Sequence, residues 1–382
     1  MSPGTHFDAA VIGAGPAGGA AALALARAGY AVVVLEKAKL PRYKTCGGGI
    51  LARGFKLLPP SVESVVERAF TSVQMNFLGT GMSFAATRPQ PLVHLAMRAD
   101  LDALLAREAR QAGAQVVESC TVKRVEPGPE SMAVITDGDT YHAKFVIGAD
   151  GIHSPAAKSL GWPELPRLAP ALEHEIHLPA EDFVRFGQSL RFDFNTIDAG
   201  YAWIFPKRAH LSVGILSTHR KCPDLPGRLA EYLQQLGIVR GWATERHGWL
   251  IPLAPRPGPL ARGRVLLAGD AAGLVDPITA EGISHALLSG QLAAAALTES
   301  RLDPAKAAPL YQSLLEREIL SELRAARLLA RLLYHHPRIR DAVFRRNGQR
   351  LCDFVASVIM GETSYRQALK RPASYLKLLG WR

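Results

Sequence analysis

Three glycines and one acidic residue near the start of the chain have the types and the spacing that bind a dinucleotide. Gly13, Gly15 and Gly18 form the pattern Gly-x-Gly-x-x-Gly, and Glu36 follows 23 residues after Gly13. The first glycine permits a tight turn, the second lets a pyrophosphate approach the backbone, and the third lets a helix pack closely on a strand. The carboxylate of Glu36 is suited to ribose hydroxyls. The segment therefore predicts a nucleotide cofactor.

This chemistry requires a strand before the glycines and a helix after them. Residues 7–12 are apolar and predict a buried strand, residues 20–28 are rich in helix formers, and residues 31–35 predict a second strand. The helix N-terminus supplies amide donors and the positive end of the helix dipole to the phosphates. Ala17, within the pattern, and Lys37, directly after Glu36, belong with the predicted cofactor-binding residues.

Two later segments each run from an apolar strand into a glycine–aspartate pair. They are residues 144–151 and residues 264–273. An aspartate at the end of a strand can accept hydrogen bonds from the sugar alcohol of a cofactor, and the neighbouring glycine allows close approach. The predicted cofactor-binding residues of these segments are Asp150, Gly151, Gly269 and Asp270.

Together, these three segments resemble the flavoprotein hydroxylase superfamily, which has the glutathione-reductase-type FAD fold. The resemblance implies that Asp270 contacts the ribityl chain of FAD and that Asp150 lies near its pyrophosphate. It also implies that Arg98 reaches the FAD from the start of a helix, which the spacing of apolar residues predicts to continue to Gly113.

Two further segments are similar to the geranylgeranyl reductase family. Cys46-Gly47-Gly48-Gly49 is a flexible loop with one thiol, able to lie against a flat ring, and residues 201–215 predict a β-hairpin with aromatic side chains on one face. Residues 269–283 match a third motif of that family, and the resemblance spans residues 7–290. It implies that Cys46, Gly47, Gly48, Gly282 and Ile283 lie beside the flavin, and that Tyr201, Trp203 and Phe205 bind substrate.

The sequence departs from the family pattern at two positions. Ala280 stands where a glycine is more usual, and Arg208 follows Lys207 where a glycine often follows. Neither departure changes the predicted fold, but both leave the exact substrate open.

The implied reaction reduces a carbon–carbon double bond of an isoprenoid chain by hydride transfer from FAD, with NAD(P)H or another reductant as electron donor. A prenyl double bond accepts a hydride only if a proton reaches its other carbon, so a proton donor must lie near the flavin. Cys46 is the hypothetical donor, unless it is an inert buried thiol. Tyr201 and Trp203 complete the catalytic candidates.

Two other function classes remain open. An FAD-dependent monooxygenase or halogenase acting on an aromatic or other hydrophobic substrate shares the glycine–aspartate motifs. Halogenases of this fold carry Trp-x-Trp-x-Ile-Pro, whereas residues 201–206 read Tyr-Ala-Trp-Ile-Phe-Pro and fit the reductase better. A non-enzymatic basic binding protein is disfavoured by the three FAD motifs.

Composition limits the partners of the protein. The chain of 382 residues has 45 basic and 34 acidic residues, a net charge of +11, and four cysteines (Cys46, Cys120, Cys222 and Cys352) without the spacing of a metal site. We expect free thiols, a cytoplasmic location, a hydrophobic or lipid substrate, no metal and no nucleic acid. The oligomeric state is left open. No apolar run reaches the ~18 residues of a membrane span. A basic amphipathic helix over residues 314–333 either contacts a membrane or packs on the body.

These patterns predict an α/β fold in which a Rossmann-like FAD domain carries an inserted β-sheet domain and C-terminal helices. The FAD domain comprises residues 1–165 and 258–300, the β-rich substrate domain residues 166–257, and the helical region residues 301–382.

Overall fold

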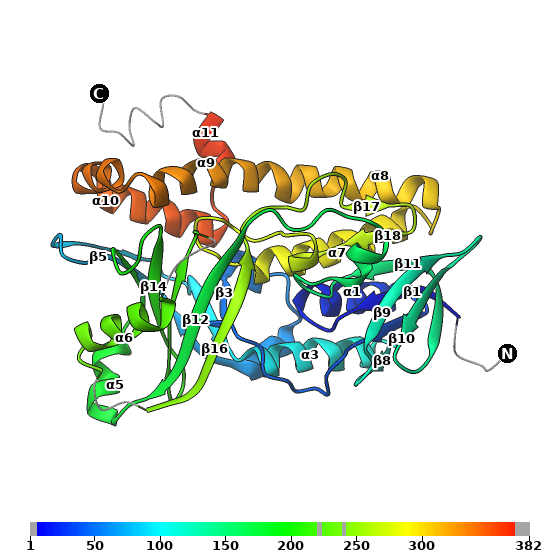
Figure 1. Ribbon diagram of the computed structural model, residues 1–382, viewed down its shortest axis with the longest axis horizontal. Helices are drawn as coiled ribbons and strands as arrows, with labels where there is room; N and C mark the ends of the chain where they lie inside the picture. The colour runs from blue at the N-terminus through cyan, green and yellow to red at the C-terminus, as the bar shows by residue number, and fades with distance from the viewer. Residues whose placement is uncertain (1–5, 220–223, 239–241, 371–382) are drawn as a thin grey trace.

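A computed structural model describes residues 6–219, 224–238 and 242–370. Cys222 lies outside these ranges. The chain forms two sheet-based parts side by side, and a layer of long helices extends across both of them (Figure 1).

An eight-stranded sheet forms the first part, and its centre confirms the predicted strand–helix–strand unit. The strand β1 pairs in parallel with β2 on one side and with β11 on the other. The strand order is β17-β18-β11-β1-β2-β8, and β10 pairs with both β11 and β9. Its strands are β1 (His6–Ile12), β2 (Val32–Leu35), β8 (Gln115–Val117), β9 (Val122–Pro127), β10 (Met132–Thr136), β11 (Thr140–Gly148), β17 (Ala261–Arg262) and β18 (Val265–Leu267). The carboxyl ends of β1, β2, β11 and β18 therefore meet at one edge of the sheet.

Helices pack against this sheet and position its glycine-rich turns. The helix α3 begins at Arg98 and ends at Gln111, which confirms the helix predicted there. Gly269 and Asp270 themselves form a 3-10 turn with Ala271, and the following helix begins only at Ile283. The other helices of this part are α1 (Pro16–Arg27), α2 (Ala52–Phe55), η1 (Pro60–Val65), α4 (Pro155–Ser159), η2 (Gly269–Ala271) and α7 (Ile283–Glu299).

A seven-stranded sheet forms the second part, in the order β16-β12-β15-β14-β13-β5-β6. The predicted hairpin is confirmed, because β14 and β15 pair antiparallel. The sheet is not confined to residues 166–257: β5 and β6 also join it, because β5 pairs in parallel with the distant β13. Alternation within either segment cannot reveal such a pairing. Its strands are β5 (Ser72–Phe77), β6 (Met82–Thr87), β12 (Leu168–His177), β13 (Leu190–Phe194), β14 (Gly200–Pro206), β15 (Leu211–Ser217) and β16 (Trp242–Pro252).

Smaller elements complete this part of the chain. A separate three-stranded sheet has the order β3-β7-β4. It consists of β3 (Gly49–Leu51), β4 (Val66–Phe70) and β7 (Val93–Ala96). The helices α5 (Ala180–Phe186) and α6 (Leu225–Gln235) lie beside the seven-stranded sheet (Figure 1).

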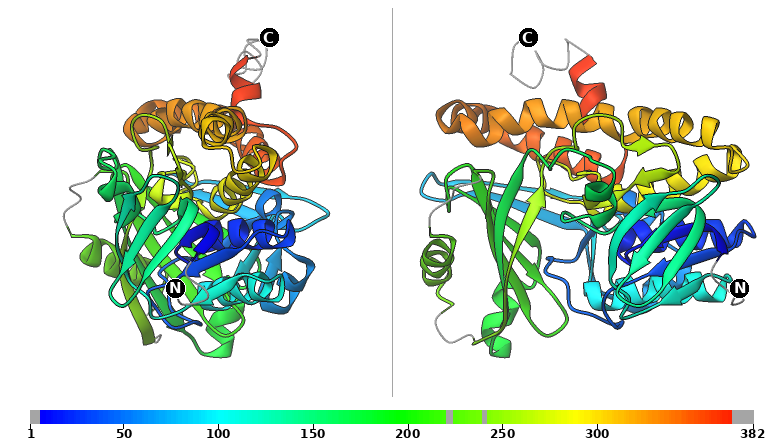
Figure 2. Two further views of the ribbon diagram at one scale, coloured as in Figure 1. Left: turned by 90° about the vertical axis from the view of Figure 1, so that its right-hand side faces the viewer. Right: turned by 45° about the vertical axis from the view of Figure 1, so that its right-hand side comes forward.

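The C-terminal helices are α8 (Pro304–Leu315), η3 (Glu316–Leu320), α9 (Ser321–His335), α10 (Pro337–Met360) and α11 (Tyr365–Lys370). The helix α8 contacts α7, and α10 contacts β6, so the layer joins the two parts (Figure 2). The amphipathic prediction is confirmed: Leu315, Ile319, Ala326 and Ala330 are buried, and the arginines of the segment are exposed. No helix in the described ranges is long and apolar enough to span a membrane.

Candidate functional site

The predicted site residues meet around one large pocket between the two sheets. Its volume is about 650 Å³, and its walls come from both the glycine-rich turns and the aromatic strand β14. Each predicted cofactor, substrate and catalytic residue lines it except Gly18. A volume of this size is typical of small-molecule and cofactor sites.

The three glycines of the first turn serve different purposes in the structure. Gly13 has a φ of +96°, which favours glycine. A Cβ atom on Gly18 would lie 1.9 Å from the carbonyl oxygen of Gly13, so this position is closed by packing. At Gly15, however, a Cβ would meet only an Arg98 nitrogen, 3.7 Å away. Gly15 is also the N-cap of α1, where no side chain caps the helix, so the first amides remain available to an anion.

Glu36 stands at the end of β2 and is 3% exposed. Its carboxylate accepts hydrogen bonds from the backbone N–H groups of Ala14, at 2.8 Å, and Ala38, at 3.1 Å, and it pairs with Arg42. Arg42 also pairs with the buried Asp102. The acid therefore ties the glycine turn to the second strand while facing the pocket.

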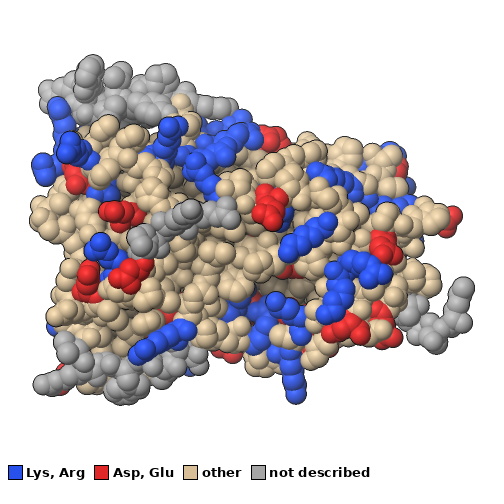
Figure 3. Space-filling view, in the orientation of Figure 1, with Lys and Arg blue, Asp and Glu red and all other residues tan. Residues whose placement is uncertain are grey.

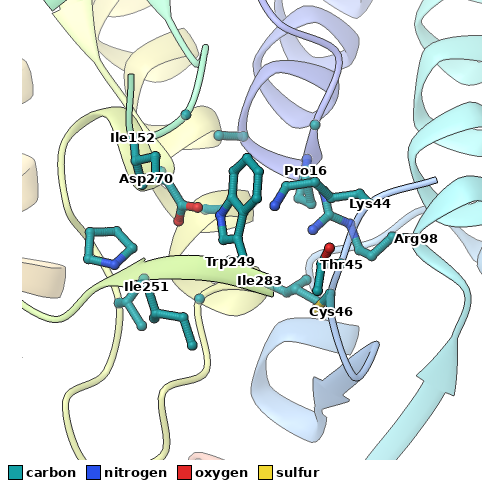
Figure 4. Close-up of a pocket in the computed structure, with 18 of the residues that line it drawn as sticks. Pro16, Lys44, Thr45, Cys46, Arg98, Ile152, Trp249, Ile251, Asp270 and Ile283 are labelled. Atoms are coloured by element: carbon teal, nitrogen blue, oxygen red, sulfur yellow. The ribbon is translucent and has the colours of Figure 1, made fainter. Parts of the chain in front are cut away.

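Arg98, Lys44 and Asp270 point into the pocket from three different segments (Figure 4). Arg98 is held by two hydrogen bonds to Asp102, at 2.9 and 2.8 Å. Burial raises the pKa of Asp270, which the charges of Lys44 and Arg98 oppose. Burial and the charge of Arg98 lower the pKa of Lys44 to about 8, although Asp270 opposes them. The two cations create a positive field that suits an anionic cofactor.

Sequence reasoning missed Lys44, and it set Trp249 aside as core packing although its segment allowed it to line a cavity. The ammonium of Lys44 lies 3.3 Å from the centroid of the Trp249 ring, a cation–π contact. Lys44 lies two residues before the Cys-Gly-Gly-Gly loop, and this proximity could have identified it. Trp249 comes from β16, and unlike Tyr201, Trp203 and Phe205 it belongs to no motif of the family.

Asp150 follows β11 and lies half-buried beside the start of α4. One carboxyl oxygen accepts a hydrogen bond from the Ala156 N–H at 3.0 Å, and the other, Oδ1, is buried without a partner among the described residues. Burial raises the pKa of Asp150. A buried unpaired oxygen beside a helix start indicates that a bound group completes the site.

The Cys-Gly-Gly-Gly loop is seated against β14. A Cβ on Gly47 would lie 2.8 Å from the Phe205 ring, and one on Gly48 would lie 2.0 Å from the Ala96 carbonyl oxygen. The Gly48 N–H donates to the Cys46 Sγ at 3.4 Å. Only glycines allow this loop to lie flat against the aromatic strand.

The aromatic residues of β14 form the other wall. Tyr201 and Trp203 are 5% and 6% exposed, and Phe205 packs beside them. The Tyr201 hydroxyl donates to the Thr279 carbonyl, and the Trp203 Nε1–H donates to the Ser212 Oγ at 3.2 Å. Since both polar atoms already bind protein groups, these two side chains give the cavity its shape. Ile359 of α10 also lines it, which sequence reasoning missed.

Within the described residues, no group of three or more His, Cys, Asp or Glu side chains is arranged to hold a metal ion.

Comparison with known proteins identifies the family. A family described as "FAD binding domain" matches residues 6–183. The chain is 32% identical to digeranylgeranylglycerophospholipid reductase 1 of Methanopyrus kandleri, over 86% of this chain and 91% of the relative. It is 30% identical to menaquinone reductase of Mycolicibacterium smegmatis, over 86% and 85%. It is 31% identical to the chloroplastic geranylgeranyl diphosphate reductase of Oryza sativa, over 78% and 67%.

Solved structures share the fold. A geranylgeranyl bacteriochlorophyll reductase-like protein from Thermoplasma acidophilum superposes with a TM-score of 0.77 at 20% identity, covering 98% of this chain and 96% of that one. A mutant of the halogenase PltM in complex with FAD gives 0.73 at 16% identity, covering 98% and 85%.

The residues present fit FAD. The uncapped start of α1, the open position at Gly15, the buried unpaired oxygen of Asp150 and the cationic pair are arranged as an anionic dinucleotide requires. From these features and its relatives, the chain belongs to the geranylgeranyl reductase family of FAD-binding flavoproteins.

Proposed function

We propose that the protein is an FAD-dependent reductase that saturates carbon–carbon double bonds of an isoprenoid chain. The observation that carries this proposal is the continuity of the pocket, in which the glycine turns for the cofactor and the aromatic wall of β14 belong to one cavity. An apolar chain can lie against Trp203 and Phe205 while one of its double bonds faces the Cys-Gly-Gly-Gly loop. The named activities of the relatives from Methanopyrus kandleri and Oryza sativa support this substrate class.

The residues of the chain have distinct roles in this proposal. Bound FAD supplies the hydride. Gly15 and the first turn of α1 hold its phosphates, and Glu36 and Asp270 bind its hydroxyl groups. Tyr201, which is fixed by its hydrogen bond to Thr279, holds the wall of the substrate cavity in place. Cys46 lines the pocket, within the loop that the family resemblance places beside the flavin.

The experiment is anaerobic turnover. The purified protein, with its flavin reduced, is mixed with a C20 prenyl diphosphate or a prenylated quinone, and mass spectrometry follows the gain of two hydrogens per double bond. We expect this gain. If neither substrate gains hydrogen, the reductase proposal is wrong.

The alternative is oxygen-dependent hydroxylation or halogenation. The halogenase likeness, at 16% identity, shows the fold alone. Oxygen consumption in step with product formation, measured with an oxygen electrode, would favour the alternative. We expect no such consumption in the presence of a prenyl substrate.

We propose NAD(P)H or another diffusible reductant as the electron donor and the cytoplasm as the compartment. Cys46, Cys120 and Cys352 are free thiols, which a reducing compartment maintains. Bleaching of the flavin absorbance on addition of NADPH or NADH without air tests the donor. Cell fractionation tests the compartment.

We further propose that the exposed face of α9 contacts an anionic membrane surface. Leu328 and Leu332, 65% and 37% exposed, lie on this face, as do the exposed arginines 324, 327 and 331. Basic side chains gather along the upper edge of the molecule, where α9 lies (Figure 3). Apolar residues among cations suit a lipid–water interface.

Vesicle sedimentation tests this contact. We expect the protein to bind phosphatidylglycerol vesicles, to bind phosphatidylcholine vesicles less, and to lose binding in the Leu328→Ser, Leu332→Ser double variant. Val184→Ser is the matched control, because Val184 is 62% exposed on α5, away from α9. Equal binding by the double variant and the control would contradict the proposal.

A further inference from the structure

Glu173 is an acidic residue buried in the seven-stranded sheet. One of its two carboxyl oxygens has no hydrogen-bond partner among the described residues. Glu173 lies in the middle of β12, opposite Gly214 of β15, and is 2% exposed. Its side chain lines the same pocket as Cys46, Trp203 and Phe205. A buried carboxyl in a cavity with apolar walls requires a structural or a chemical reason.

The hydrogen bonds around Glu173 determine which of its oxygens can carry a proton. Trp203 Nε1–H donates to Ser212 Oγ, and the Ser212 hydroxyl donates in turn to Glu173 Oε1. In this arrangement Ser212 Oγ accepts from the indole and donates to Oε1, so Oε1 is an acceptor. The other oxygen, Oε2, is buried and makes no hydrogen bond to the described residues. A proton on this carboxyl therefore resides on Oε2.

Neighbouring groups shift the pKa of the Glu173 carboxyl in both directions. Burial raises the pKa of Glu173, and Glu175 on the same strand acts in the same direction. Ser212, Lys207 and the backbone of Cys46 oppose this rise. The Lys207 ammonium is 1% exposed and donates to the Ala96 carbonyl at 2.9 Å, so it stays in place whether or not Glu173 is charged.

We propose that Glu173 is the acid that supplies the proton in double-bond reduction, from Oε2, across the cavity that it shares with the Cys-Gly-Gly-Gly loop. This inference rests on the proposed function and deepens it. The Oε2–H bond of Glu173 breaks and a C–H bond forms at one carbon of the double bond, while the other carbon receives the hydride. The pair of π electrons enters the new C–H bond, and reduced FAD, the reductant, is oxidised by two electrons. The carboxylate left behind is balanced by Lys207 and regains a proton from water.

Cys46 has a different role in this arrangement. Its Sγ accepts a hydrogen bond from the Gly48 N–H, which shapes the loop beside the flavin. Removal of the thiol should therefore change the flavin environment more than it changes the delivery of the proton.

The first test measures protonation without turnover. Infrared difference spectra of the FAD-bound protein, wild type minus Glu173→Gln at pH 7, should contain the C=O stretch of a protonated carboxyl. The difference between wild type and Glu175→Gln is the control, because Glu175 lies on the same face of β12 but does not line the pocket. A Glu173 that shows only carboxylate bands would overturn the proposal.

The second test is a single turnover with reduced enzyme and a C20 prenyl diphosphate. We expect Glu173→Gln to slow product formation by roughly 100-fold or more, in the range of a lost general acid, with FAD affinity unchanged. Glu173→Asp should restore part of the rate, and Glu175→Gln, which keeps the Glu173 carboxyl, should slow product formation far less than Glu173→Gln. A Glu173→Gln enzyme with the wild-type rate would refute the assignment. A wild-type enzyme that reduces no prenyl double bond would refute the proposed function instead, and the infrared band would still decide whether Glu173 is held as an acid.

Discussion

The hydroxyl of Tyr201 donates a hydrogen bond to the backbone carbonyl of Thr279 at 2.5 Å, and this bond joins the substrate strand to a loop of the cofactor pocket. Tyr334 of α9 donates to the neighbouring Ile278 carbonyl, and Tyr365 of α11 donates to Asp276. Three tyrosines from three elements thus hold the segment that leads into α7. The position of this loop depends on the second sheet and the C-terminal helices as much as on the FAD domain.

Tyr201→Phe should therefore impair substrate reduction more than cofactor binding. The variant leaves the Thr279 carbonyl without its donor, at a cost of about 1–3 kcal/mol in the free energy of unfolding. We expect slower product formation and an FAD dissociation constant within about twofold of wild type, measured by flavin fluorescence titration. Tyr232→Phe is the control, because Tyr232 of α6 donates to Asp193 and does not line the pocket. Equal losses of activity in both variants would contradict this prediction.

Ala280→Gly should stabilise the protein. Ala280 has a φ of +54°, in the left-handed region that favours glycine, which explains why glycine is more usual there. Relief of about 1–2 kcal/mol of strain exceeds the added chain entropy of glycine, about 0.4–1 kcal/mol. Urea denaturation should show a higher midpoint. Ala272→Gly, where φ is −90°, should lower the midpoint. A lower midpoint for Ala280→Gly would show that the Cβ contacts outweigh the strain.

Gly15→Ala and Gly18→Ala should fail in different ways. A methyl group at Gly15 fits the backbone and projects toward the cofactor space, so the variant should fold with a near-wild-type melting temperature and bind FAD at least tenfold more weakly. A methyl group at Gly18 collides with the Gly13 carbonyl, so this variant should lose melting temperature first. Thermal melting of the apoproteins separates the two effects. Equal melting losses would disprove the distinction.

FAD affinity should weaken as the pH rises through about 8, the pKa to which burial lowers the Lys44 ammonium. The cationic form attracts the anionic cofactor, and the neutral form above this pH does not. We expect the dissociation constant to rise by up to about tenfold from pH 7 to pH 9, as a group with this pKa allows. Lys44→Arg should remove the pH step and retain tight binding, since an arginine stays charged. Lys44→Met should remove the step and bind weakly throughout. If the pH step in FAD affinity persisted in Lys44→Met, the step would arise from a group other than Lys44.

The sequence alone determined the local units of this protein. The glycine turn between residues 13 and 18, the strand before it and the acid at position 36 follow from backbone rules that act over short distances, as does the amphipathic helix through residues 314–333. These motifs also predicted that the cofactor-binding residues share one site, because the strands of a parallel sheet end at a common edge.

Only the tertiary structure decided which distant groups meet. Glu173 reads as one more residue of an alternating strand, and its burial against Ser212 and the Cys46 loop arises from the pairing of β12 with β15. The pKa of Lys44 is lowered by burial and by the charge of Arg98, which lies far along the chain. Ile359 reaches the cavity because α10 packs across the second sheet. Sequence periodicity shows which face of an element is apolar, but not which other element covers it, and the burial that changes the chemistry of a carboxyl or an amine depends on that covering element.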